Sequence, residues 1–419
     1  MASKLQMSED DDIRRKLSQD AYSVSLDALG VKRADGAQLP SNSPCEDRYN
    51  RAQPVPLWEG EETWVGVTIF DGHYGWQTAD HLEKELLSWV QAKLNKLQPA
   101  SRTDASIQDA IEAAFTELDD SIINNYVAYA RSKDMTLEQK VPYMEVAMAG
   151  SCALLVLYNP NTKTLYTACT GDSRAVLGYQ AYDGTWLPVA LSEDQTCAND
   201  AEAARLREEH SNEESVLKDG RVLGLAVSRA FGNFRWKSRR EEQEEFGRRF
   251  LHCGPVGGRE RTPTPPYLIA RPVVTVARLR DESPAVLVVA SDGIWDQCEN
   301  YEVVDLVVRW LEAQPESSLA AMRMTLTRTP DTVWWKKTPP PPAEAHCPPG
   351  FDFLERWNNF DIRFREERGV VEDLDNVAVH ILRNACGGNH QELLRARLAY
   401  RPPFSRDVRD DLTVQVLFF

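Results

Sequence analysis

Asp71 and His73, two side chains suited to catalysis, follow a run with the composition of a buried strand. Residues 65–70 are mostly apolar or β-branched, and they end at Asp71-Gly72-His73 before a long helical pattern begins. A packed sheet can fix an acid and an imidazole at a strand end while the following loop stays open to substrate. This arrangement suits a metal site or a general acid/base pair, although an Asp-Gly-His sequence after a strand is more often only a turn.

Other carboxylates recur at the ends of predicted elements far along the chain. An apolar run, 285–290, leads into Asp292-Gly293, and Asp172 lies in a turn between two strand-like runs. The full set at element ends comprises Glu46, Asp47, Asp71, Asp172, Asp292, Asp296 and Asp410. So many hard oxygen ligands, without clustered cysteine or histidine, indicate Mg²⁺ or Mn²⁺ rather than zinc. If these acids converge, bound cations or protonation must offset their mutual repulsion. The alternative for Glu46-Asp47-Arg48 is a solvated loop, which is what paired acids beside an arginine usually form.

Composition limits the partners of such a site. The 419-residue chain carries a net charge of −16, which disfavours nonspecific binding of nucleic acid and repels a phosphorylated partner unless cations intervene. Its eight cysteines are scattered without a Cys-x-x-Cys pair, so we expect free thiols in a reducing compartment. No run of about 18 apolar residues occurs, so we expect no membrane span.

The N-terminus bears on the compartment. Residues 8–12 are Ser-Glu-Asp-Asp-Asp, the opposite of the arginine-rich, acid-poor composition of an organelle transit peptide, and no apolar core of a secretion signal is present. On this ground alone the chain is expected to be soluble and intracellular.

The elements that must position these acids are helices over antiparallel strands. Residues 76–97 and 105–129 carry apolar side chains at helical spacing, which is typical of helices that cover a sheet with one face. The strand-like runs 151–158, 164–170 and 174–178 are joined by turns too short for a parallel crossover, so consecutive runs must be antiparallel. We expect insertions near 237–266, a charged and then Gly/Pro-rich surface segment, and near 314–371, which is proline-rich.

Six ordered motifs resemble the signature set of the metal-dependent serine/threonine phosphatases, the protein phosphatase 2C family. They are Glu46-Asp47, Asp71-Gly72-His73-x-Gly75, Gly171-Asp172-Ser173-Arg174, Ser228-Arg229-Ala230-Phe231-Gly232, Ser291-Asp292-Gly293-x-Trp295-Asp296 and Arg409-Asp410-Asp411. Within the family the chain is most similar to the pyruvate dehydrogenase phosphatase branch, for example at residues 41–48 and 264–268. The resemblance implies an α+β fold, a four-layer α-β-β-α sandwich of two mostly antiparallel sheets. It places the catalytic domain at 40–419, after an N-terminal extension at 1–39.

The resemblance also assigns roles to the acids. Asp71 would bridge two ions, with Glu46 and the Gly72 carbonyl completing one site. Asp292 and Asp410 would complete the other. Asp47 would hold metal-bound water, and Asp172 and Asp296, with Asp292, match a weaker third site. Two such ions lower the pKa of a shared water, and the resulting hydroxide would attack phosphorus in line with the leaving serine or threonine oxygen.

His73 would protonate the leaving alkoxide, a role that suits an imidazole with an ordinary pKa of about 6.5. The alternative is a histidine that only forms a hydrogen bond in its turn. Two positions depart from the wider family. Asn42 stands where most members have a phosphate-gripping arginine, so Asn42 and Arg48 are the candidate phosphate contacts. Asn233 ends a motif that usually closes with aspartate, and we expect it to support structure rather than bind metal.

The expected function is therefore dephosphorylation of phosphoserine and phosphothreonine in a protein substrate by a monomeric Mg²⁺- or Mn²⁺-dependent enzyme. The branch resemblance suggests the E1α subunit of pyruvate dehydrogenase as a substrate and the mitochondrial matrix as the compartment. The visible N-terminus instead suggests the cytoplasm. Two alternatives remain: a catalytically weak, phosphatase-like adaptor protein, and a metallohydrolase of small phosphate esters.

Overall fold

The computed structural model describes residues 9–322 and 369–419, except 214, 252, 258–262 and 281–282, and it has an α+β fold. The chain divides into two compact units, each assembled from separated segments. Unit 1 comprises residues 1–45, 175–190 and 279–419, and unit 2 comprises residues 46–174 and 191–278.

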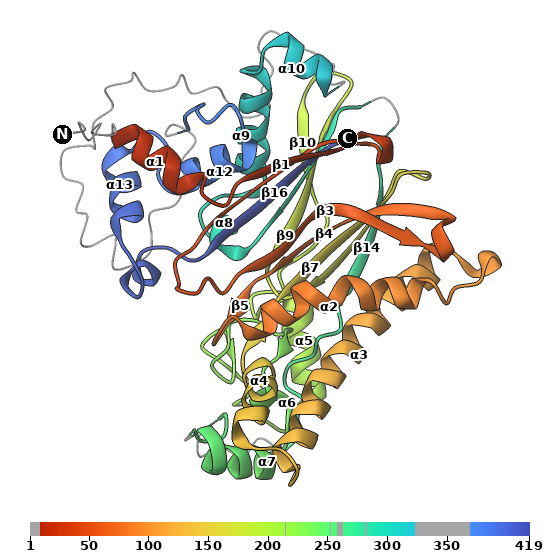
Figure 1. The fold of residues 1–419 in the computed structure, drawn as a ribbon, viewed down its shortest axis with the longest axis vertical. Helices are drawn as coiled ribbons and strands as arrows, with labels where there is room; N and C mark the ends of the chain where they lie inside the picture. The colour runs from red at the N-terminus through yellow and green to blue at the C-terminus, as the bar shows by residue number, and fades with distance from the viewer. Residues whose placement is uncertain (1–8, 214, 252, 258–262, 281–282, 323–368) are drawn as a thin grey trace. The chain divides into compact units, whose positions relative to one another are not determined.

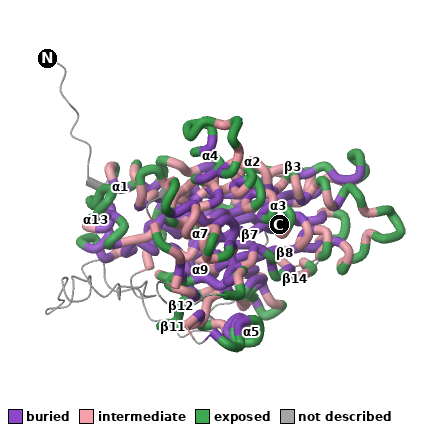
Figure 2. The backbone as a smooth tube through the Cα atoms, turned by 90° about the horizontal axis from the view of Figure 1, so that it is seen from below, coloured by how far each residue is buried: buried purple, intermediate pink, exposed green. Residues whose placement is uncertain are grey.

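Unit 2 is built on a five-stranded antiparallel sheet. In spatial order its strands are β14 (Val273–Arg278), β8 (Thr164–Thr170), β7 (Ala153–Asn159), β4 (Glu62–Phe70) and β3 (Arg48–Leu57). Every residue of β7 and β8 is buried, as the purple tube of Figure 2 shows. The antiparallel pairing predicted for the strands after residue 150 is confirmed where β7 meets β8. It is wrong for the runs 164–170 and 174–178, because the chain passes at residues 171–173 from this sheet into another, where β9 (Arg174–Gln180) lies between β15 (Ala285–Ala290) and β10 (Trp186–Ala190).

Three helices of unit 2 follow the predicted helical patterns. They are α2 (Gln77–Leu94), α3 (Asp104–Arg131) and α4 (Leu137–Met148), and Figure 1 shows α2 and α3 lying along the sheet. Both contact its strands with an apolar face whose members, such as Leu86 and Phe115, are fully buried. Thr103 and Thr136 begin α3 and α4 as N-caps in capping boxes.

The rest of unit 2 contains shorter elements. A small antiparallel sheet joins β13 (Phe231–Gly232), β6 (Gly150–Ser151) and β5 (Gly72–His73). The others are α5 (Asp200–Glu209), the hairpin β11 (Leu217–Lys218) and β12 (Arg221–Val222), α6 (Phe234–Lys237), α7 (Arg240–Phe246) and a π-helical turn, Gly247–Leu251.

Unit 1 is built on a six-stranded, mostly antiparallel sheet. In spatial order its strands are β1 (Tyr22–Leu26), β2 (Val31–Leu39), β16 (Leu412–Phe418), β15 (Ala285–Ala290), β9 (Arg174–Gln180) and β10 (Trp186–Ala190). Its described helices are α1 (Glu9–Leu17), α8 (Asp292–Trp295), α9 (Asn300–Glu312), α10 (Glu316–Ala321), α12 (Val377–Ala385) and α13 (Gln391–Ala399). The apolar faces of α9 and α12 pack on strands of this sheet.

The predicted α+β class, with two mostly antiparallel sheets and covering helices, is confirmed. The predicted domain start at residue 40 falls at the end of β2, whose hydrogen bonds to β16 tie residues 33–39 into the sheet. The domain limits themselves stay a prediction. The segment near 237–266 is more than a surface loop, because Phe246 is 1% exposed and its ring lies 5.2 Å from that of Tyr126. Most of 314–371 lies outside the described residues.

None of the helices in the described parts of the chain is long and apolar enough to cross a membrane.

Candidate metal and catalytic site

Glu46 and the Asp71 turn meet at one end of the large sheet of unit 2. Arg48 pairs with Phe70 across β3 and β4, so the residues just before β3 and just after β4 emerge side by side. The backbone N–H of Gly75 donates to Glu46 Oε1 at 2.6 Å. A Cβ on Gly72 would lie 2.4 Å from the carbonyl oxygen of Glu46, so only glycine permits this approach. The structure thus brings together the predicted ligands Glu46 and Gly72.

Asp172 approaches the same turn from the loop between β8 and β9. One of its carboxylate oxygens lies within 4.8 Å of one of Asp71. Cys152 links the two acids, since its backbone N–H donates to the Asp71 carbonyl at 2.8 Å and its thiol donates to Asp172 Oδ1 at 3.3 Å. Burial, followed by the charges of Asp172 and Asp71, raises the pKa of the Cys152 thiol well above its usual range. The thiol therefore keeps its proton and remains a donor.

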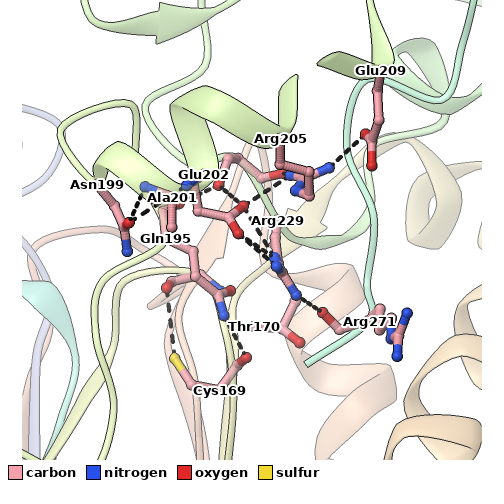
Figure 3. Close-up of polar contacts among 12 residues, drawn as sticks. Cys169, Thr170, Gln195, Asn199, Ala201, Glu202, Arg205, Glu209, Arg229 and Arg271 are labelled. Carbon is pink, nitrogen blue, oxygen red and sulfur yellow. Dashed lines mark hydrogen bonds and ion pairs between the residues drawn. The ribbon is translucent and has the colours of Figure 1, made fainter. Parts of the chain in front are cut away.

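Gln195 holds the turn that carries Asp172. Its side-chain Oε1 accepts from the Gly171 N–H at 2.7 Å, and its Nε2 donates to the Cys169 carbonyl at 2.9 Å (Figure 3). Its own backbone N–H donates to the Gly171 carbonyl at 2.9 Å. Gln195 is 1% exposed, and three hydrogen bonds from one buried residue leave the backbone around Asp172 little freedom.

A buried ion pair lies behind Gln195. The Ser228 backbone N–H donates to the Gln195 carbonyl at 2.8 Å, and its hydroxyl donates to Glu202 Oε2 at 2.6 Å. Arg229 binds both carboxylate oxygens of Glu202 and also donates to the Arg271 carbonyl (Figure 3). Burial alone would raise the pKa of Glu202, but the hydrogen bonds from Arg229, Arg205 and Ser228 outweigh it and lower that pKa to about 2. The Ser228-Arg229 motif thus supports the Asp172 turn.

His73 is oriented by Asn233. Residues 72–73 and 231–232 pair with opposite edges of β6, which places His73 opposite Gly150 and Asn233 just beyond Gly232. His73 Nε2 lies 2.9 Å from Asn233 Oδ1, a hydrogen bond that gives the imidazole a fixed plane. A Cβ on Gly150 would come within 2.3 Å of both side chains, so the glycine makes room for the pair.

The Asn233 turn is held by a second buried ion pair. Asn233 is fully buried with a left-handed φ of 50°, and its N–H donates to the Ala149 carbonyl at 2.7 Å. Asp119 accepts from the Gly232 N–H at 2.8 Å and pairs with Lys237 at 2.5 Å. Burial raises the pKa of Asp119 and lowers that of Lys237, while their mutual attraction opposes both shifts. This α3 acid therefore fixes the loop behind His73.

Unit 1 gathers the remaining predicted acids at one end of β15 and β16. The Ser291 N–H donates to the Thr413 carbonyl at 3.0 Å, which aligns Asp292 with the residues before β16. A Cβ on Gly293 would lie 2.1 Å from the Asp411 carbonyl and 3.4 Å from the Asp410 Cβ. The Asp296 N–H donates to the Asp292 carbonyl at 2.7 Å. Asp292, Asp296 and Asp410 are thus neighbours, and Asp410 also pairs with Arg406.

The candidate phosphate contacts have protein partners. The Arg48 guanidinium lies 3.6 Å from Asp80 and stacks over Trp76 at 5.5 Å, and its Nη1 donates to the Asp47 carbonyl. The Asn42 N–H donates to Asp411 Oδ1 at 3.1 Å. Asp47 is 1% exposed. Phosphate binding by Asn42 and Arg48, and water binding by Asp47, stay predictions.

The donor set in each unit fits a hard divalent cation. In unit 2 the carboxylates of Asp71 and Asp172 approach each other, beside the tightly packed Glu46-Gly72 contact. Carboxylate and carbonyl oxygens are the ligands that Mg²⁺ and Mn²⁺ prefer, and close carboxylates need such a charge to be stable. Sequence reasoning missed the supporting residues Cys152, Gln195 and Asp119. Of the three, only Cys152 lies in an apolar run, and no local signal marks Gln195 or Asp119.

Comparisons with known proteins agree with this geometry. The family model described as Protein phosphatase 2C matches residues 29–328, well over half of the chain. A protein phosphatase 2C homolog of Schizosaccharomyces pombe is 34% identical over 98% of this chain and 85% of its own length. The mitochondrial [pyruvate dehydrogenase [acetyl-transferring]]-phosphatase 1 of Saccharomyces cerevisiae is 33% identical over 93% of this chain and 69% of its own length. The human protein of that name is 30% identical over 92% of this chain and 77% of its own length. The chain therefore belongs to the protein phosphatase 2C family, the metal-dependent protein serine/threonine phosphatases.

Proposed function

We propose that this phosphatase uses its predicted acid ligands to hold two Mg²⁺ or Mn²⁺ ions, with a weaker third. Glu46, Asp71 and the Gly72 carbonyl would serve one ion, and Asp71, Asp292 and Asp410 the other. Asp47 would hold water, and Asp172, Asp292 and Asp296 the third ion. The contact of Glu46 with the Asp71-Gly72 turn carries this proposal, because two of the predicted ligands meet there at a sheet end.

The ions supply, when bound, charge neutralisation and a water of lowered pKa. The chain's own residues do the remaining work. His73 holds the proton that the leaving serine or threonine oxygen takes up, and Asn233 fixes the ring that carries it. Cys152 and Gln195 keep Asp172 in place, so the site is preorganised before substrate arrives.

We further propose that the substrate is the phosphorylated E1α subunit of pyruvate dehydrogenase and that the compartment is the mitochondrial matrix. The names of the yeast and human relatives support both points. Localisation of the tagged full-length protein in cells tests the proposed compartment. An adaptor without activity is disfavoured, because the chain retains a carboxylate at every predicted acid-ligand position.

The test measures phosphate release from phosphorylated pyruvate dehydrogenase E1α with Mn²⁺ or Mg²⁺, against unrelated phosphoproteins. We expect phosphate release to be fastest from E1α. Chelation of the metal ions should abolish it, and so should the substitution Asp71→Asn. Equal turnover of all phosphoproteins would overturn the proposed substrate. Binding without turnover would favour the adaptor, and turnover of small esters alone would favour a small-molecule phosphatase.

A further inference from the structure

A pocket of about 460 Å³ opens in unit 2 beside His73. Its walls come from three places: Tyr74 and Gln77 just after His73, the α4 helix, and the segment from α6 to Cys253. Figure 1 shows α4 next to α6. This volume lies within the range of about 300–1,000 Å³ that is usual for ligand sites. Nothing in the proposed chemistry uses it.

One face of α4 supplies most of the apolar lining. Leu137, Val141, Met144 and Met148 follow one another at helical spacing, and all four line the pocket. Met144 is buried, but Leu137 is 58% and Val141 37% exposed. Large apolar side chains held at a concave surface next to a reactive centre indicate a binding site. The two methionines add adaptable side chains.

Another wall, formed by Tyr74 and Trp236, lies next to His73. The Tyr74 ring lies 5.9 Å from the His73 ring and stacks on Trp236 at 5.7 Å. Trp236 is 4% exposed, and its indole N–H donates to the Val222 carbonyl at 3.2 Å. Tyr74 has a left-handed φ of 57° yet is 65% exposed. A bulky residue in that conformation is strained, which is common at functional sites.

We propose that this pocket binds a large apolar side chain of the substrate protein, a few residues from the phosphorylated one. The proposal rests on the phosphatase function above, because that function places the phosphorylated residue at His73. An extended chain advances about 3.3–3.6 Å per residue, and one ring, that of Tyr74, lies between His73 and the pocket wall at Trp236. A side chain within about four residues of the phosphate therefore reaches the pocket.

The test uses phosphoserine peptides of one polar background in which a single leucine occupies each position within about four residues of the phosphoserine. Leu137→Ser/Val141→Ser removes the apolar stripe without adding charge, and both positions are exposed enough to leave folding intact. Tyr143→Ser is the matched control, since Tyr143 is 44% exposed on the same helix and does not line the pocket. Hydrolysis of 4-nitrophenyl phosphate reports the catalytic centre alone.

We expect leucine at one or two adjacent positions to raise kcat/KM about tenfold or more, as filling an apolar pocket does. The double variant loses this preference, the control keeps it, and all three proteins hydrolyse the ester equally. A flat response across the peptides overturns the proposal, as does a double variant that slows ester and peptide alike. Failure of the unaltered protein to hydrolyse either substrate contradicts the proposed function instead.

Discussion

His73 Nε2 and Asn233 Oδ1 lie 2.9 Å apart although 160 residues separate them in sequence. The strand β6 makes this possible, because it pairs with the His73 strand on one edge and with the strand that leads into Asn233 on the other. The departure from the family motif at residue 233 therefore supplies a neutral hydrogen-bond acceptor to the proposed general acid.

Asn233→Ala should lower kcat more than tenfold with little change in KM, because the ring loses its fixed orientation while substrate contacts persist. Asn233→Asp keeps an acceptor oxygen, and aspartate, like asparagine, tolerates the left-handed backbone at this position. This variant should therefore retain most of the kcat of the unaltered protein. Steady-state kinetics on a phosphopeptide, with thermal unfolding as a folding check, measure both. Equal kcat for the alanine variant and the unaltered protein would show that Asn233 does not position His73.

Cys152→Ala should weaken metal binding at the Asp172 side by about tenfold, since partners of metal ligands commonly contribute that much. Cys152→Ser keeps a donor and should stay close to the unaltered protein. Mn²⁺ titrations followed by calorimetry measure the affinity independently of turnover. Cys298→Ala, which removes a buried thiol from the core of unit 1, is the control and should leave the affinity unchanged.

Glu202 should make stability depend on pH below about 4.5. Its folded pKa of about 2 lies below its ordinary value of 4.5. Its contribution is therefore fully present above about pH 4.5 and is lost as the pH falls toward about 2, amounting to about 3 kcal/mol. Urea unfolding between these pH values should show a shallower slope for Glu202→Gln. Parallel profiles for the two proteins would mean that Glu202 is not held ionised.

Asp119→Leu should destabilise the fold by about 3–5 kcal/mol, because it leaves the buried Lys237 ammonium without its counter-charge. Adding Lys237→Met to Asp119→Leu should recover much of this loss, since an apolar pair replaces the ion pair. Chemical denaturation of the single and double variants measures the coupling. If the losses simply add, the two side chains do not stabilise each other.

Patterns among neighbouring residues predicted a large part of this architecture. The alternation and turns after residue 150 identified β7 and β8, and the apolar spacing of 76–97 identified α2, because both signals arise from neighbouring residues. The pairing of β2 with β16 could not be predicted, because partners nearly 400 residues apart leave no local pattern in the sequence.

Local motifs likewise predicted some residues of the candidate site and missed those that depend on contacts between distant segments. Glu46 and Gly72 were predicted as ligands from motifs, and their contact follows from the pairing of β3 with β4. Cys152 was covered only by the general expectation of free thiols, since its donation to Asp172 depends on two loops meeting in space. No role was predicted for Gln195, because a lone glutamine in a loop looks like a solvated side chain. Its three hydrogen bonds are visible only in the structure.

The interleaved course of the backbone has a practical consequence. The peptide leaves unit 1 after Cys45, returns for the hairpin of β9 and β10, leaves again, and comes back at Leu279. No continuous stretch of the gene encodes either unit alone, because residues 46–278, which contain all of unit 2, also contain β9 and β10, two strands of the sheet of unit 1. Dissecting this enzyme therefore calls for circular permutants or co-expressed fragments rather than shortened versions.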